Sequence, residues 1–372
     1  MLKEKLPELR IGSLKLDTPI VQGGMGVGIS LSGLAAAVAN AGGIGVISSV
    51  ALGLLDESKS RKYREANLIM LREEIRRARR LSGGVIGLNI MVALTDYLEL
   101  LECAIEEQVD IVFMGAGLPL KFPERYSAEE IRRLPTHFAP IVSSGRAAGL
   151  IFKHWEKHFG RIPDAVVVEG PKAGGHLGFR PEQIFHPAYQ LENLIPEVVQ
   201  VVKGYEERYQ REIPVIAAGG IYDGADMARF LELGARGIQM GTRFVATEEC
   251  DASAAFKQSY IDCREEDIQI IQSPVGLPGR AIRNRFLEEV KAGEKKPFRC
   301  SWKCLKSCDF RTTPYCIADA LANAQKGQLL KGFTFAGANA HRVDRIVKVK
   351  ELFAELQREY AEALRLAPAC SA

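Results

Sequence analysis

The 372-residue sequence predicts an α/β protein, a (β/α)8 TIM barrel that carries a C-terminal extension. Short apolar runs rich in valine and isoleucine recur along the chain, and each is followed by a stretch with helical periodicity. This alternation is typical of repeated βα units around a parallel sheet. Eight units within about 250 residues favour a closed barrel, because open doubly wound sheets usually contain fewer strands.

The eight apolar runs are the expected strands of the barrel. In chain order they cover residues 19–25, 43–49, 85–91, 111–117, 138–144, 165–170, 214–220 and 237–245. Most of them end in glycines or small polar residues, which taken singly are also typical of tight turns. The carboxyl ends of barrel strands meet at one face, and glycine lets the backbone approach a planar or phosphorylated ligand. The repetition therefore predicts an active site at this face.

Two regions depart from the regular alternation. Residues 50–84 form an expected insertion, and its portion 68–81 has helical spacing, so we expect this helix to lie over the rim of the barrel. We divide the chain into a barrel over residues 1–250 and an extension over residues 251–372. The extension ends in an amphipathic helix expected near 343–364, and we expect it to pack on the barrel rather than to form an independent domain.

The charge pattern excludes several classes of partner. The chain has 49 basic and 46 acidic residues, so it lacks the single-sign field of proteins that bind nucleic acid or anionic membranes. Residues 1–10 mix charges and do not resemble a secretory signal, while the charge-free segment 18–55 contains nine glycines, which argue against a membrane helix. We therefore expect a cytoplasmic protein with a small-molecule substrate, and neither a nucleic-acid nor a membrane partner.

Glycines after the seventh and eighth runs predict a phosphate site. Gly219 and Gly220 follow the seventh run, and residues 239–242 end the eighth. Loops at these two positions of a barrel commonly bind phosphate, because exposed backbone N–H groups converge there. Thr242 can add a hydroxyl donor, whereas Arg243 is open to two interpretations, a phosphate partner or a surface charge.

One histidine lies in the glycine-rich loop after the sixth run. His176 is placed at the expected active face, where an imidazole is suited to proton transfer, although a loop histidine is often only a structural polar residue. The other histidines lack this setting, and we interpret them as structural: His137, His154, His158, His186 and His341.

Together these motifs resemble the nitronate monooxygenase family, formerly called 2-nitropropane dioxygenases. The resemblance runs from about residue 19 to residue 284. Its motifs are Gln-Gly-Gly-Met (22–25), Gly-Leu-Asn (87–89), Ala-Gly-Gly-His (173–176), Ala-Ala-Gly-Gly-Ile (217–221) and Gln-Met-Gly-Thr-Arg-Phe (239–244). It implies an FMN-binding barrel in which His176 faces the substrate. The residues implied to bind the flavin are Gly23, Gly24, Met25, Asn89, Glu169, Gly174, Gly219, Gly220, Gln239, Met240, Gly241 and Thr242.

The resemblance implies oxidation of alkyl nitronates, with O2, to carbonyl compounds and nitrite. Two residues depart from the family pattern. Nitronate monooxygenases often have Gln at the position of Glu169, whereas the related flavin-dependent type II enoyl-acyl-carrier-protein reductases have Glu, and Lys172 replaces an acidic residue common to both groups. The alternatives are therefore an NAD(P)H-dependent reductase of enoyl thioesters and a non-catalytic flavin-binding or metal-binding protein.

Four of the eight cysteines cluster in the extension. Cys300, Cys304, Cys308 and Cys316 have C-x3-C-x3-C-x7-C spacing, and without a signal sequence we expect their thiols to be reduced. Four thiolates can hold zinc or an iron–sulfur cluster. The spacing lacks the C-x2-C pairs usual in zinc sites, and cysteines are also common core residues. The sequence leaves the metal content open.

Overall fold

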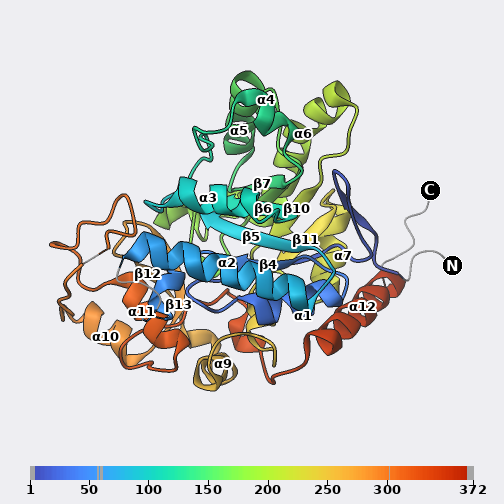
Figure 1. Cartoon of the computed structure of the whole chain (residues 1–372). Helices are drawn as coiled ribbons and strands as arrows, with labels where there is room; N and C mark the ends of the chain where they lie inside the picture. Colours follow the sequence, from blue (N-terminus) through green and yellow to red (C-terminus); the bar gives the residue numbers. More distant parts are fainter. Residues whose placement is uncertain (1–4, 57, 59–61, 301, 367–372) are drawn as a thin grey trace.

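The computed structural model describes residues 5–56, 58, 62–300 and 302–366. Eight parallel strands form one sheet in the order β3-β11-β10-β8-β7-β6-β5-β4 (Figure 1). β3 and β4 close it, because the amide of Ile44 donates to the Ile20 carbonyl and the amide of Gln22 donates to the Ile44 carbonyl, each over 3.0 Å. The predicted barrel is confirmed.

Each predicted run contains or overlaps one strand, but the strands are shorter because the terminal glycines leave the sheet and form the βα turns. The strands are β3 (Ile20–Gln22), β4 (Gly45–Ser48), β5 (Ile86–Met91), β6 (Ile111–Gly115), β7 (His137–Val142), β8 (Val166–Glu169), β10 (Val215–Ala218) and β11 (Gly237–Met240). An N-terminal hairpin of β1 (Leu9–Ile11) and β2 (Leu14–Leu16) packs its leucine and isoleucine side chains against the residues that fill the barrel.

Helices connect the strands and surround the barrel. They are α1 (Ser32–Asn40), α2 (Tyr63–Leu81), α3 (Tyr97–Glu106), α4 (Ala128–Arg133), α5 (Gly145–Phe159), α6 (Leu191–Tyr209), α7 (Gly224–Glu232) and the four-residue α8 (Thr242–Val245). None of the helices in the described ranges is both long enough and apolar enough to cross a membrane.

Segment 50–84 joins β4 to β5, and its place over the barrel rim stays a prediction. Residues 57 and 59–61 of this segment lie outside the described residues, but α2 itself is the outer helix that connects β4 to β5, and it packs beside α1 and α3. Its apolar face, which includes Leu71 and Ile75, is buried, and Glu74 accepts a hydrogen bond from the Ser32 amide at the start of α1. This burial on neighbouring helices holds α2 in the outer ring.

The C-terminal extension contributes a small sheet and four helices. The hairpin of β12 (Ile268–Gln272) and β13 (Pro278–Ile282) pairs with β9 (Gly175–His176), which follows the sixth barrel strand. The helices are α9 (Ala254–Ile261), α10 (Arg285–Lys291), α11 (Ile317–Gln325) and α12 (Val349–Leu366). Barrel and extension share one hydrophobic core, and the division at residue 250 stays a prediction.

Helix α12 takes the place of an eighth outer helix. α8 is too short to cover the barrel, and α12 packs against both α7 and α1 (Figure 1). It begins six residues later than predicted for the final helix, because the segment before it is extended and Val347 pairs with Thr247. The barrel wall is therefore completed by residues from the far end of the chain.

Leu356→Ala is expected to lower the free energy of unfolding by about 2–5 kcal/mol, because the side chain is fully buried in α12 and its loss leaves a cavity. Leu366→Ala, in the same helix but 85% exposed, is the matched control and should change it by less than about 0.5 kcal/mol. Denaturant titration measures both. If Leu356→Ala lowers the free energy of unfolding no more than Leu366→Ala does, α12 does not stabilise the barrel.

Candidate active site

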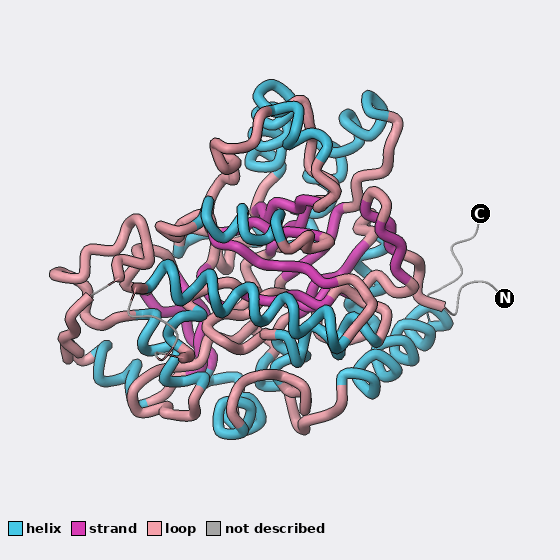
Figure 2. Tube along the Cα trace, in the orientation of Figure 1, coloured by secondary structure: helices cyan, strands magenta, loops and turns pink. Residues whose placement is uncertain are grey.

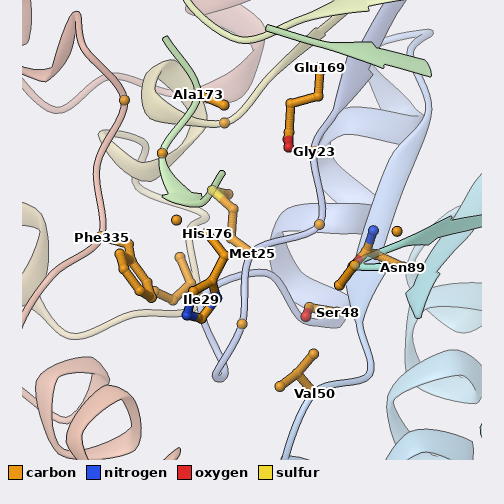
Figure 3. Close-up of a pocket in the computed structure, with 18 of the residues that line it drawn as sticks. Gly23, Met25, Ile29, Ser48, Val50, Asn89, Glu169, Ala173, His176 and Phe335 are labelled. Atoms are coloured by element: carbon orange, nitrogen blue, oxygen red, sulfur yellow. The ribbon is translucent and has the colours of Figure 1, made fainter. Parts of the chain in front are cut away.

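A cavity of about 300 Å³ opens at the carboxyl ends of the barrel strands, within the size range of small-molecule sites. The structure brings all the residues predicted to bind flavin, and His176, to its wall. They are Gly23, Gly24, Met25, Asn89, Glu169, Gly174, His176, Gly219, Gly220, Gln239, Met240, Gly241 and Thr242. Figure 3 shows Met25, Glu169 and His176 around this space. Their individual roles stay predictions.

Several glycines of the cavity wall are positions where a side chain would clash or strain the backbone. Gly219 and Gly220 have φ of +93° and +95°, and a Cβ on Gly219 would lie 2.7 Å from the Gly170 carbonyl oxygen. A Cβ on Gly24 would lie 2.3 Å from the Cβ of Asn89. The wall is therefore bare backbone at the place where a planar ring and a phosphate would need close approach, and the residues present fit a flavin.

His176 reaches the cavity from β9 and is held by the extension. Its Nε2 lies 2.7 Å from Ser273 Oγ, and its ring meets the edge of Phe335 at a centroid distance of 5.0 Å. Burial lowers the pKa of His176 to about 4, so the imidazole is neutral at pH 7. Within the described residues Nδ1 has no hydrogen-bond partner, which leaves this nitrogen available to a ligand.

Glu169 ends β8 and points into the same cavity. Burial raises the pKa of its carboxyl to about 7, so the group changes charge near neutral pH. The loop that follows it is held by Arg280 of β13, which donates hydrogen bonds to the carbonyls of Pro171 and Ala173, the latter over 2.9 Å. The extension thus fixes the segment that connects Glu169 to His176.

The extension supplies cavity residues that the sequence did not predict. Residues 335–339 line the cavity, the amide of Gly337 donates to Thr242 Oγ1 over 3.3 Å, and Asn339 Nδ2 donates to the Gly220 carbonyl over 2.7 Å. The Gly-Ala-Asn sequence at 337–339 was the available signal. These bonds fasten the two loops predicted to bind phosphate.

Neither interpretation of Arg243 is correct. The side chain is buried, stacks on Tyr222 with its guanidinium carbon 4.5 Å from the ring centre, and pairs with Glu355 of α12 over 3.2 Å. It therefore links the barrel to α12. Lys172 is exposed at the cavity rim, and the other five histidines do not line the cavity described above.

Comparison with known proteins identifies the family. A family model described as nitronate monooxygenase matches residues 8–359. The chain belongs to the nitronate monooxygenase family. It is therefore an enzyme, a flavin-dependent oxidoreductase.

Relatives within and near this family carry different names. The chain is 28% identical over 321 residues to a probable nitronate monooxygenase of Staphylococcus aureus (strain Newman), covering 76% of this chain and 79% of that protein. It is 29% identical over 294 residues to the (3aS,4S,5R,7aS)-5-hydroxy-7a-methyl-1-oxo-octahydro-1H-indene-4-carboxyl-CoA dehydrogenase of Mycobacterium tuberculosis (strain ATCC 25618 / H37Rv), covering 79% of this chain and 70% of that protein.

Solved structures with the same fold include two that superpose over most of the chain. FabK from Thermotoga maritima superposes with a TM-score of 0.72 at 28% identity, over 94% of each chain. Nitroalkane oxidase from Streptomyces ansochromogenes superposes with a TM-score of 0.70 at 24% identity, over 95% of this chain and 98% of that one, and it supports the fold alone.

Proposed function

We propose that this protein is an FMN-dependent nitronate monooxygenase that oxidises alkyl nitronates, with O2, to carbonyl compounds and nitrite. The observation that carries the proposal is the neutral imidazole of His176 beside a glycine-lined cavity. Gly337 and Asn339 hold together the two loops that we propose bind the single phosphate of FMN.

The low pKa of His176 favours a nitronate over a neutral nitroalkane as the substrate. An imidazole with a pKa of about 4 is a weak base for removing a proton from carbon, whereas its neutral N–H is a good hydrogen-bond donor to an anionic oxygen. We assign Ser273 as the donor to Nε2, an assignment that puts the proton on Nδ1, from which it can be donated to a nitronate oxygen. Bound flavin would accept the electrons and react with oxygen, and the residues of the chain orient the substrate and stabilise its charge.

Two observations favour reduction of an enoyl thioester as a second candidate function. Glu169 matches the reductases at a position inside the cavity, and the outer wall of the cavity is apolar enough to take an acyl chain. That wall is formed by Val50, Tyr63, Leu94, Leu305, Ile317 and Leu321. The Mycobacterium tuberculosis relative is named as acting on a carboxyl-CoA, which is also a thioester.

Anaerobic mixing of the flavin-loaded enzyme separates these functions. Loss of oxidised-flavin absorbance with an alkyl nitronate but not with NADH or NADPH, followed by nitrite release when air is admitted, is the expected result. Rapid loss of absorbance with NADH or NADPH, and its recovery on adding crotonyl-CoA, would replace the proposal by enoyl thioester reduction. Flavin that neither reagent reduces would overturn both candidate functions.

Glu169→Gln is expected to change how the flavin reduction potential depends on pH. Above pH about 7 the wild-type carboxyl is ionised, and its negative charge beside the flavin disfavours added electrons, whereas Gln stays neutral. At pH values above about 7, the reduction potential of the wild type should therefore be lower than that of the variant by roughly 30 mV, or about 1.4 kcal/mol. At lower pH the two potentials should be equal. Potentials measured from pH 5 to 9 test this, and a constant difference would contradict it.

A further inference from the structure

The loop that joins α10 to α11 carries the four clustered cysteines. Its described residues, 292–300 and 302–316, form no helix or strand, although the loop lies on a well-packed barrel (Figure 2, pink). Irregular loops longer than about 12–15 residues are uncommon in compact domains and are usually functional or disordered. Its backbone is held to the barrel near Cys304 and Leu305, where Leu305 pairs with Leu94 and the amide of Thr95 donates to the Cys304 carbonyl over 3.0 Å.

A second cavity, of about 330 Å³, lies inside this loop. All four cysteines of the cluster line it, together with the aromatic side chains of Phe298, Phe310 and Tyr315. Lys303 and Arg311 also line it, against a single acidic residue, Asp309. The cavity thus offers four sulfur ligands, apolar walls and an excess of positive charge, which suits a ligand with negative charge.

The four cysteines are free thiols, and all of them line this one cavity. The amide of Lys303 donates to the sulfur of Cys300 over 3.3 Å. Amide donors of this kind are typical around metal-bound thiolates, where they tune the metal centre.

The arrangement does not suit a single metal ion. A zinc ion needs four ligands each about 2.0–2.3 Å from one point, and no three Cys, His, Asp or Glu side chains among the described residues are gathered closely enough to hold a metal ion. The cysteines instead surround a space. Thiolates set around a space are the ligand arrangement of a polynuclear cluster, whose irons and sulfides fill the centre.

We propose that Cys300, Cys304, Cys308 and Cys316 bind a four-iron, four-sulfur cluster in the cavity that they line. The thiols would lose their protons on binding, as metal ligation requires, and the positive side chains of Lys303 and Arg311 would offset the negative charge of the ligated cluster.

The proposed cluster adjoins the candidate active site. Cys304, Leu305 and Ile317 line both cavities, so Cys304 would be a cluster ligand and part of the wall beside the flavin site. Between the two, Tyr63 of α2 stacks on Trp302 of the loop with a centroid distance of 5.3 Å. The cluster would therefore order the part of the extension that forms the apolar outer wall.

The proposal is tested directly by measuring iron and acid-labile sulfide in the full-length protein. The protein is purified without oxygen and then incubated with ferrous iron and sulfide. We expect about four of each per chain, and a paramagnetic signal on reduction with dithionite, as for other clusters held by four cysteines. Zinc in place of iron, or no bound iron after incubation, would overturn the proposal whatever the enzyme turns over.

Substitution identifies the ligands. Cys308→Ala and Cys316→Ala should each lower bound iron at least about five-fold while the flavin content stays unchanged. Cys263→Ala is the matched control, because Cys263 is a free cysteine of the extension outside both cavities, and it should keep both cofactors. Unchanged iron in the two cluster variants would exclude these cysteines as ligands.

Discussion

His176→Ala is expected to lower kcat/KM with an alkyl nitronate by about 10²–10³-fold while the enzyme keeps its flavin. The substitution removes the proposed Nδ1–H donor to the nitronate oxygen, in a cavity where burial strengthens such a bond. The side chain reaches the cavity from β9. Steady-state nitrite release and the ratio of flavin to protein measure the two effects.

The control for this variant is His158→Ala, on the exposed surface of α5 and away from the cavity. It should leave both measurements unchanged. Wild-type turnover in His176→Ala would remove this histidine from the mechanism. Loss of flavin in that variant would instead give the histidine a role in binding the cofactor.

Gly219→Ala is expected to weaken FMN binding by roughly 10- to 100-fold. Alanine at a φ of +93° costs about 1–3 kcal/mol, and its Cβ would press against the Gly170 carbonyl, so the turn after β10 must move. Since this turn is expected to hold the flavin phosphate, the displacement should appear as lost flavin rather than as lost chemistry. Fluorescence titration of the flavin-free protein with FMN gives the dissociation constant.

Gly293→Ala separates backbone strain from displacement of the turn. Gly293 has nearly the same φ, +94°, but nothing lies within 4 Å of the position of its Cβ, and it does not line the cavity. Gly293→Ala should lower the free energy of unfolding about as much as Gly219→Ala does, while its affinity for FMN stays that of the wild type. Equal FMN affinity in the two variants would contradict the assignment of the phosphate end.

The sequence predicted the barrel and the composition of the cavity because both leave local patterns. Valine-rich runs such as 165–170 identify buried parallel strands, and glycines such as Gly219 mark the turn at each carboxyl end. Since closure of the barrel gathers all these ends at one face, residues far apart in the sequence are placed together by topology alone.

The contributions of the extension could not be predicted in this way. Hydrogen bonds across long stretches of sequence connect the site to Ser273, Arg280 and Asn339, and no periodicity in the sequence predicts such pairs. The same reason explains why the role of Arg243 was not predicted, since its partner Glu355 lies 112 residues later (355 − 243). Helical spacing identifies a helix but not the surface on which it packs.

The late origin of α12 has a consequence for synthesis on the ribosome. The nascent chain completes all eight barrel strands by residue 240, yet the groove between α7 and α1 stays uncovered until α12 has been made, more than 100 residues later. During that interval apolar side chains that later contact Leu352 and Leu356 face water. The unfinished barrel should therefore depend on chaperones more than a barrel whose helices follow its strands in order.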